Sequence, residues 1–166
     1  MCTVSSEHPA SHIDHSLVLC FRIGLEQIYQ LTRNGSHILR VTLKDWSGNT
    51  AHAEYSNFRV DDEAGLYRLR YGSFIGGTAG DALGYGSYPH KNQAFSTPDN
   101  DNDNTSTDCA GHYRSGWWFN GCFAANLNGR RLTSSNIGET RGIHWWTWKN
   151  QWYSMKRASM KIRRVA

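Results

Sequence analysis

Two runs of alternating apolar and polar residues predict a β-hairpin early in the chain. The first run spans residues 38–46, and the second follows the turn sequence SGN. A period of two places every second side chain on one face of a strand, so these runs predict two paired strands that bury one face. The apolar positions of that face are Leu39, Val41, Leu43, Ala51, Ala53 and Tyr55.

Weaker patterns predict four more elements. Residues 24–31 carry apolar side chains at helical spacing, which predicts a short amphipathic helix. Residues 66–71 alternate and predict a third strand, and residues 159–163 predict a final one. Between them, a glycine-rich segment is expected to hold a short helical turn at 81–83.

Residues 85–142 show no sustained period of either kind. This stretch is polar, rich in glycine and interspersed with aromatic residues. A structureless segment of this length is improbable inside a compact domain unless a metal ion or a disulfide replaces the missing secondary structure. We therefore expect one or both in this part of the chain.

The composition indicates one globular domain with irregular structure. The 166 residues are 39% hydrophobic and 19% charged, with 16 glycines and 3 prolines. A protein of this size buries roughly 70% of its unfolded surface. Abundant glycine without a long apolar run indicates short strands joined by many turns, not a helical bundle.

The charge adds little to this picture. A net charge of +4 could favour acidic glycans or nucleic acids, but a solvated basic end is the simpler interpretation. Much of the positive charge lies in Lys156, Arg157, Lys161, Arg163 and Arg164. No run approaches the ~20 apolar residues of a membrane-spanning helix, so we expect no membrane insertion. Residues 1–23 lack the pattern of a secretory signal.

The densest polar cluster is the run DNDNDN at residues 99–104, followed by TSTD. Carboxylates at alternate positions suit a hard cation such as calcium, which takes oxygen ligands. An EF-hand is excluded because Asn104 and Ala110 stand where that motif needs Gly and Glu. A solvated loop without a metal is the alternative.

Four cysteines permit three disulfide pairings. Cys109 and Cys122 are best placed for a bridge because they lie in one region rich in glycine and tryptophan, just after the acidic run. Such a bridge and a metal ion would hold the same segment. Two free buried thiols are the alternative, and Cys2 and Cys20 lie in an atypical first segment.

No pattern indicates an enzyme or a nucleic-acid-binding protein. The 8 histidines form no recognisable nucleophile motif with serine or cysteine. The tryptophans could stack nucleobases, but without a basic, aromatic strand platform they are better explained as residues of the core and of a pocket wall. We therefore expect a binding protein that is not an enzyme and has no nucleic-acid partner.

Three segments carry a family resemblance: FSTPDNDNDNTSTDCA, SGWWFNGCFAANLNGR and IHWWTWKNQWYSMKRASMKIR. They are similar to the C-terminal part of the fibrinogen-like domain, found in fibrinogen chains, ficolins, angiopoietins, tenascins and fibroleukin-like proteins. The resemblance runs from about Gly24 to Arg163. It implies an α+β fold with a small antiparallel or mixed sheet, short helices and a long loop-rich calcium-binding subdomain.

The resemblance also implies how the protein is divided. Residues 1–23 form an atypical segment that we expect to be poorly ordered, and residues 24–166 form a truncated fibrinogen-like domain. Within it we expect the central sheet region at about 24–84, the loop-rich subdomain at about 85–152 and a final strand at about 153–163. The family's first subdomain has no recognisable counterpart in residues 1–23.

By position, the resemblance implies a calcium site in the acidic run. Its ligands would be the side chains of Asp101 and Asp103 and the backbone carbonyls of Thr105 and Thr107. Asp99 would lie just outside the site. Calcium is therefore the expected cofactor.

The resemblance further implies a Cys109–Cys122 bridge and a ligand-binding region beside calcium. In members that bind acetylated sugars, an aromatic wall and backbone amides around a cis peptide bond, here Gly121–Cys122, hold the acetyl group. Tyr113 matches one wall position, whereas Phe123 stands where histidine is common. The expected ligand-binding residues are Tyr113, Gly121, Cys122 and Phe123.

The resemblance leaves three interpretations of the protein's role. The first is a secreted, extracellular lectin that binds acetylated glycans with calcium in innate-immune recognition. The second is a domain that binds a receptor or matrix protein, which is favoured by departures from the acetyl-binding pattern at Glu139, Thr140 and Gln151. The third is an inactive truncated fragment. Oligomers would form through a longer parent protein.

Overall fold

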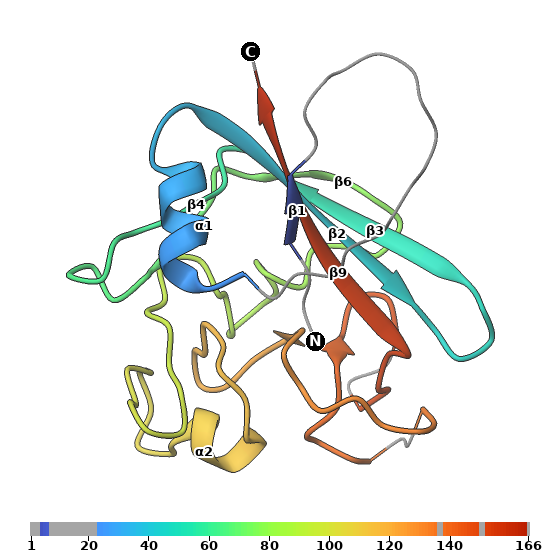
Figure 1. Cartoon of the computed structure of the whole chain (residues 1–166). Helices are drawn as coiled ribbons and strands as arrows, with labels where there is room; N and C mark the ends of the chain where they lie inside the picture. The colour runs from blue at the N-terminus through green and yellow to red at the C-terminus, as the bar shows by residue number, and fades with distance from the viewer. Residues whose placement is uncertain (1–3, 7–22, 136–137, 150–151, 166) are drawn as a thin grey trace.

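The computed structural model describes residues 4–6, 23–135, 138–149 and 152–165. These residues form short helices and strands linked by long loops (Figure 1). In sequence order the elements are β1 (Val4–Ser6), α1 (Leu25–Thr32), β2 (Ser36–Lys44), β3 (Thr50–Tyr55), β4 (Arg59–Val60), β5 (Leu69–Arg70), β6 (Phe74–Gly76), α2 (Cys109–Tyr113), β7 (Ala125–Asn126), β8 (His144–Trp145) and β9 (Arg157–Val165).

The largest sheet has five strands in the order β1-β9-β2-β3-β6. β1 pairs parallel to β9 and the other neighbours pair antiparallel, so the expected mixed sheet is confirmed. β9 comes last in the sequence but lies between β1 and β2 (Figure 1). The sheet therefore joins segments that are far apart in the sequence.

The predicted hairpin is confirmed as β2 and β3. Leu39 lies opposite Tyr55, and Val41 lies opposite Ala53. All four side chains are buried, because the alternation of the sequence places them on the inner face of the sheet. The hairpin thus supplies one wall of the core.

The first hairpin strand ends before the predicted boundary because Asp45 begins the turn. Its carboxylate accepts hydrogen bonds from the backbone and side-chain N–H groups of Asn49, each at 2.8 Å, and forms an ion pair with Lys149 at 3.0 Å. Burial alone would raise the pKa of Asp45, but these bonds from Asn49 and Lys149 outweigh burial and hold it at about 2. The turn is thereby tied to the loop-rich part.

The predicted helix is confirmed as α1. Ile28 and Thr32 lie on its buried face. The Thr32 hydroxyl donates to the Ile28 carbonyl at 2.8 Å and accepts from the backbone N–H of Val60 at 3.2 Å. The helix is therefore connected directly to β4.

The predicted third strand, 66–71, is correct only for Leu69–Arg70. Leu66 and Tyr67 have φ angles of 57° and 49°, in the left-handed region that strands do not use. The N–H of Leu66 donates to the Glu63 carbonyl at 2.8 Å. A turn therefore occupies the first half of the predicted strand.

The predicted helical turn at 81–83 is wrong, since no helix forms there. Instead, Oδ1 of Asp81 accepts the backbone N–H of Gly84 at 2.8 Å and the hydroxyl of Tyr55 at 2.9 Å. A short polar side chain bonded to its own backbone stabilises a turn without a helix. The bond to Tyr55 fixes this turn against β3.

One buried cluster joins the inner face of the sheet to the loop-rich part. Trp117, Trp118 and Trp145 are at most 2% exposed, which confirms their expected place in the core. The indole N–H of Trp145 donates to the Ala79 carbonyl at 3.1 Å. Packed aromatic rings thus replace regular structure in a region where only short elements form.

The two ends of the protein differ from the expected division. The final strand is confirmed as β9, but it begins at Arg157 because the N–H of Ser154 donates to Ser135 and that of Met155 donates to Ile143. Of the segment 1–23, the structure describes β1 and Ile23, and β1 is a strand. The expectation of poor order for the rest, together with Cys2 and Cys20, lies outside the described residues.

No helix within the described ranges is long and apolar enough to cross a membrane.

Candidate functional site

The acidic run folds into a loop held by its own polar side chains. Oδ1 of Asp101 accepts the N–H of Asp103 at 3.1 Å, and Oδ1 of Asp103 accepts the N–H of Thr105 at 2.9 Å. The N–H of Thr107 points to the Thr105 hydroxyl at 3.4 Å. This repeat uses the same alternate positions at which the family resemblance implies a calcium site. We call residues 99–108 the acidic loop.

The acidic loop is anchored to the body of the domain through Asn102. Its side-chain N–H donates to the Phe95 carbonyl at 3.0 Å, and its backbone N–H donates to the hydroxyl of buried Ser96, also at 3.0 Å. Asp99 lies at the beginning of the loop, where a bond from the Thr97 hydroxyl lowers its pKa. Asn102 therefore anchors the loop at the position between Asp101 and Asp103.

The residues of the acidic loop fit the chemistry of calcium. Among the described residues, no three His, Cys, Asp or Glu side chains group closely enough to hold a metal ion. A site here would therefore combine two carboxylates, those of Asp101 and Asp103, with carbonyl and water oxygens. Calcium accepts that mixture of hard oxygen ligands, and no soft ligand lies among residues 99–108.

A disulfide connects the acidic loop to a second segment. Cys109 and Cys122 are bonded, which confirms the predicted bridge. The N–H of Cys109 donates to Oδ2 of Asp103 at 3.0 Å, and the carboxylate of Asp108 caps α2 by accepting the N–H of Gly111. One side of the bridge is thus fixed by a proposed calcium ligand. The expected cis peptide bond Gly121–Cys122 is also present.

Aromatic side chains lie together near Cys122, the second cysteine of the bridge. β7 pairs with β8, and the backbone N–H of Trp146 donates to the Ala124 carbonyl at 3.0 Å, so two distant segments meet. The ring centroid of Phe123 lies 5.8 Å from that of Trp146 and 5.7 Å from that of His144. We call this group the aromatic cluster. Its members are Tyr113, Phe119, Phe123, His144, Trp146 and Trp152.

The aromatic cluster has a buried base and a partly exposed rim. Phe123 and His144 are buried, whereas Tyr113, Trp146 and Trp152 are partly exposed. Tyr85, which is 48% exposed, and Tyr88 both contact the edge of Trp146. Large half-exposed aromatic rings are typical of binding surfaces because they can bury much apolar area on a partner.

Trp146 carries a polar atom without a partner. Its indole N–H is buried and forms no hydrogen bond with any described residue. Trp117 also has an unpaired indole N–H, but its ring is 1% exposed and lies in the core. An unpaired buried donor costs free energy, which a ligand acceptor can recover. The indole N–H of Trp146 is therefore a candidate contact for a ligand whose binding moves the atoms that cover it.

Two buried histidines support the cluster. Burial lowers the pKa of His144, whose Nδ1 lies 3.2 Å from the Tyr153 carbonyl. His90 lies behind the segment that carries Phe123, and its Nε2 accepts the backbone N–H groups of Ala124 and Ala125. Both imidazoles are therefore neutral near pH 7 and act as structural supports.

The structure brings the predicted ligand-binding residues into one region. The rings of Tyr113 and Phe123 lie 4.7 Å apart, and the Gly121–Cys122 peptide lies between their segments along the sequence. A Cβ atom on Gly121 would lie 3.8 Å from the Tyr88 ring. Gln151, named as a departure from the acetyl-binding pattern, lies outside the described residues.

The prediction missed several residues of the cluster. His144, Trp146 and Trp152 were not named among the ligand-binding residues, nor was the neighbouring Tyr88, although 142–152 is visibly an aromatic run in the sequence. That run was available as a signal, but nothing in its spacing shows that β8 would pair with β7. The partners of Phe123 therefore became visible only in the fold.

Comparison with known families gives a match over most of the sequence. The model of the C-terminal globular domain of fibrinogen beta and gamma chains matches residues 12–165. This match begins upstream of Gly24, where the resemblance was expected to begin.

Curated relatives support the same grouping. The fibrinogen gamma chain of Rattus norvegicus is 45% identical over 161 residues, which cover 86% of this chain and 36% of the relative. Fibrinogen-like protein 1 of Rattus norvegicus is 42% identical over 149 residues, covering 85% of this chain and 47% of the relative. This chain thus spans less than half the length of these relatives.

Solved structures show the same fold. The fibrinogen-like globe domain of human ANGPTL6 matches with a TM-score of 0.80 and 39% identity, covering 86% of this chain and 63% of that one. The lamprey fibrin D-dimer in complex with the peptide Gly-His-Arg-Pro-amide matches with a TM-score of 0.76 and 35% identity. The match covers 84% of this chain and 48% of that one.

Proposed function

The protein belongs to the family of C-terminal globular domains of fibrinogen beta and gamma chains, and from this premise we propose that it binds a segment of a protein partner at the aromatic cluster. It would do so as a secreted, calcium-dependent recognition domain. Members of this family are generally binding modules, and no feature of this sequence indicates an enzyme. A receptor or matrix protein is the class of partner we propose.

The partly exposed Trp146, with its unpaired indole N–H, is the observation that supports this function best. Peptide carbonyls are acceptors that could pair with this N–H once the atoms covering it move, while apolar side chains of the partner would cover Tyr85 and Tyr88 beside the rim. The lamprey relative is a peptide complex, which supports a peptide segment as the ligand class. The cluster therefore combines an apolar surface with at least one directed polar contact.

We propose that calcium, held by Asp101 and Asp103 with carbonyls of Thr105 and Thr107, orders the acidic loop. The ion would neutralise two neighbouring carboxylates whose oxygens already accept backbone N–H groups. Asp103 also accepts the backbone N–H of Cys109, and Cys109 is bonded to Cys122, which precedes Phe123. An ordered loop would therefore also hold the segment of Phe123 in place. Calcium would act on ligand binding through this connection and not by direct contact.

Replacing Asp103 by asparagine is expected to weaken calcium binding by roughly tenfold or more, because ligand charge sets the affinity of such sites. Asn retains an oxygen that can accept one of the two N–H groups now bonded to Asp103. Isothermal titration calorimetry measures the effect. Calcium at about 100 times its Kd should also raise the free energy of unfolding of the unmodified protein by about 2.7 kcal/mol.

The matched control is Asp99→Asn, which makes the same chemical change just outside the proposed site. It should bind calcium like the unmodified protein. Equal loss of affinity in both variants would indicate a diffuse charge effect, and unchanged affinity in Asp103→Asn would remove Asp103 from the site.

Replacing Trp146 by phenylalanine is expected to weaken binding of the peptide Gly-His-Arg-Pro-amide by about tenfold, the effect of losing one hydrogen bond. The ring remains, so packing against Phe123 is largely kept. Trp148→Phe, at a partly exposed neighbouring ring outside the cluster, is the matched control. Titration calorimetry with calcium present measures both variants.

An acetylated glycan is the second candidate ligand. An acetyl group also pairs a methyl, which aromatic rings can cover, with an oxygen that can accept the indole N–H of Trp146. N-acetylglucosamine is therefore titrated in parallel with the peptide. If only the sugar binds, and Trp146→Phe weakens it, the protein-segment proposal fails and the lectin function takes its place.

We propose that the protein is secreted. Disulfides persist in oxidising compartments and are rare in the cytosol, so the Cys109–Cys122 bond supports a secreted protein.

A further inference from the structure

The outer face of the central sheet is rich in cations. Side chains of β2 and β9 alternate between the buried inner face and the opposite, outer face. Five exposed cations lie on the outer face of these two strands, and we call them the cationic face. They are Arg40, Lys44, Arg157, Lys161 and Arg163.

The strand register places like charges directly opposite each other. Lys44 lies opposite Arg157, and Arg40 lies opposite Lys161. Like charges in such cross-strand pairs destabilise a sheet. Two such pairs between the same two strands lower the stability of the sheet. A role in binding would explain why they are present.

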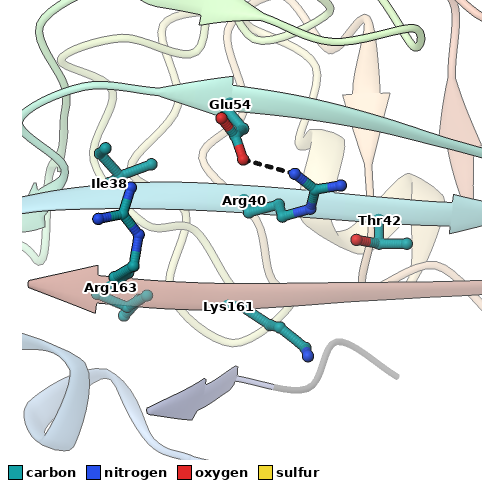
Figure 2. Close-up of a pocket in the computed structure, with 7 residues that line it drawn as sticks. Ile38, Arg40, Thr42, Glu54, Lys161 and Arg163 are labelled. Carbon is teal, nitrogen blue, oxygen red and sulfur yellow. Dashed lines mark hydrogen bonds and ion pairs between the residues drawn. The ribbon is translucent and has the colours of Figure 1, made fainter. Parts of the chain in front are cut away.

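One carboxylate offsets part of this charge. Glu54 on β3 bonds to Arg40 at 2.6 Å, as Figure 2 shows. Among the described residues, no carboxylate lies within ion-pairing distance of Lys44, Arg157 or Arg163. The cationic face therefore keeps a strong net positive charge toward solvent.

A shallow hollow lies within this face. Its volume is about 240 Å³, and Arg40, Lys161 and Arg163 contribute to its lining beside Ile38 and Thr42. Figure 2 shows Ile38, Arg40 and Thr42 on β2 and Lys161 and Arg163 on β9. Cationic groups, a hydroxyl and an apolar surface together suit a ligand that carries both anionic groups and a carbon ring.

The spacing of the cations suits an extended ligand. Residues two apart on a strand are separated by about 6.7 Å, so Arg157 and Arg163 mark a track of about 20 Å along β9. The opposing cations of β2 double the track over part of its length. A compact anion would meet one pair, whereas a linear polyanion could meet them all.

We propose that the cationic face binds a sulfated glycan, laid along β2 and β9. None of the outward residues of these strands is aromatic, so the face lacks the rings on which nucleic-acid bases stack. The disulfide supports the proposed secretion, and sulfated glycans occur outside cells, on their surfaces and in the matrix. This surface is separate from the aromatic cluster and does not depend on its ligand.

Lys44→Glu tests the proposal because it should move binding and stability in opposite directions. The substitution places a carboxylate opposite Arg157, so the melting temperature should be unchanged or higher. Affinity for a heparin hexasaccharide should fall by about tenfold, since two units of charge are lost from the track. Titration calorimetry at low and high salt measures binding, and affinity should fall as salt rises.

Arg131→Glu is the matched control, because Arg131 is an exposed cation in a loop outside the face. It makes the same change in net charge and should keep the affinity of the unmodified protein. Arg157→Glu repeats the test from the opposite strand. Equal loss in Arg131→Glu and Lys44→Glu would overturn the proposal, because only net charge would then matter.

The type of polyanion is tested with three further probes. A chemically desulfated hexasaccharide should bind weakly or not at all. Tighter binding of a single-stranded oligonucleotide, or of phosphatidylserine-containing vesicles, would overturn the assignment to sulfated glycans. Failure of every probe to bind would also overturn it and leave the cations with the role of keeping the exposed face of the sheet soluble.

Discussion

Replacing both Cys109 and Cys122 by alanine is expected to lower the free energy of unfolding by about 3 kcal/mol. The bridge joins residues separated by 13 positions, and closing a loop of that size in the unfolded state is worth about 3 kcal/mol in the chain-entropy account. The effect should be large here because the surrounding part of the protein has only short regular elements. Urea denaturation measures it.

The loss should be local before it is global. Hydrogen exchange is expected to speed up in the acidic loop and around Phe123, while β2 and β3 keep their protection, since their ladder does not involve the bridge. Unmodified protein with its disulfide reduced should behave like the double variant. An unchanged unfolding free energy in both samples would show that the aromatic core alone holds this region.

Acidification from pH 7 to pH 4 is expected to destabilise the protein by roughly 3 kcal/mol through His90 alone. The imidazole is fully buried, and burial lowers its pKa to about 4, although the Trp118 carbonyl opposes the shift. Nδ1 donates to that carbonyl at 2.7 Å, because Nε2 must accept the N–H groups of Ala124 and Ala125. A second proton, on Nε2, would point at these two N–H donors.

The direction follows from proton uptake. Between pH 6.5 and about 4 the unfolded state binds a proton at His90 and the folded state does not, so stability falls as the pH falls. The contribution is complete above pH 6.5 and is lost once the pH passes below about 4. Burial also lowers the pKa values of His37 and His144, which adds to the loss in the same direction.

His90→Gln checks the assignment. The variant should be less stable at pH 7, because the paired imidazole is lost, but its stability should change less between pH 7 and pH 4. Urea denaturation over this pH range measures the difference, with His112→Gln as a control at an exposed histidine. If His90→Gln loses as much stability on acidification as the unmodified protein, His90 is not the group responsible.

Several parts of the fold were predictable because they are local. Alternation at Leu39, Val41 and Leu43 predicted β2, and helical spacing predicted α1. These patterns depend only on which face of an element is buried. The strand expected over 66–71 failed where two residues adopt left-handed φ angles, and the helical turn at 81–83 failed because Asp81 bonds to Gly84 and Tyr55.

The candidate site divides in the same way. Asp101 and Asp103 stand out because their alternation is local, and the family resemblance identified the bridge. The partners of Phe123 were not predictable from spacing, because Trp146 reaches it only through the pairing of β7 with β8. His90 gave no sequence signal, since its role depends on backbone N–H groups far along the sequence.

The sequence by itself determined the hairpin, the first helix, the acidic loop's composition and, through its motifs, the family. Those properties depend on neighbouring residues, whose side-chain period and chemistry can be read directly. Only the tertiary structure decided which cations share the outer face, because the position of β9 beside β2 places Arg157 opposite Lys44. It also decided which rings form the aromatic cluster, because long-range pairing, not local preference, brings β7 and β8 together.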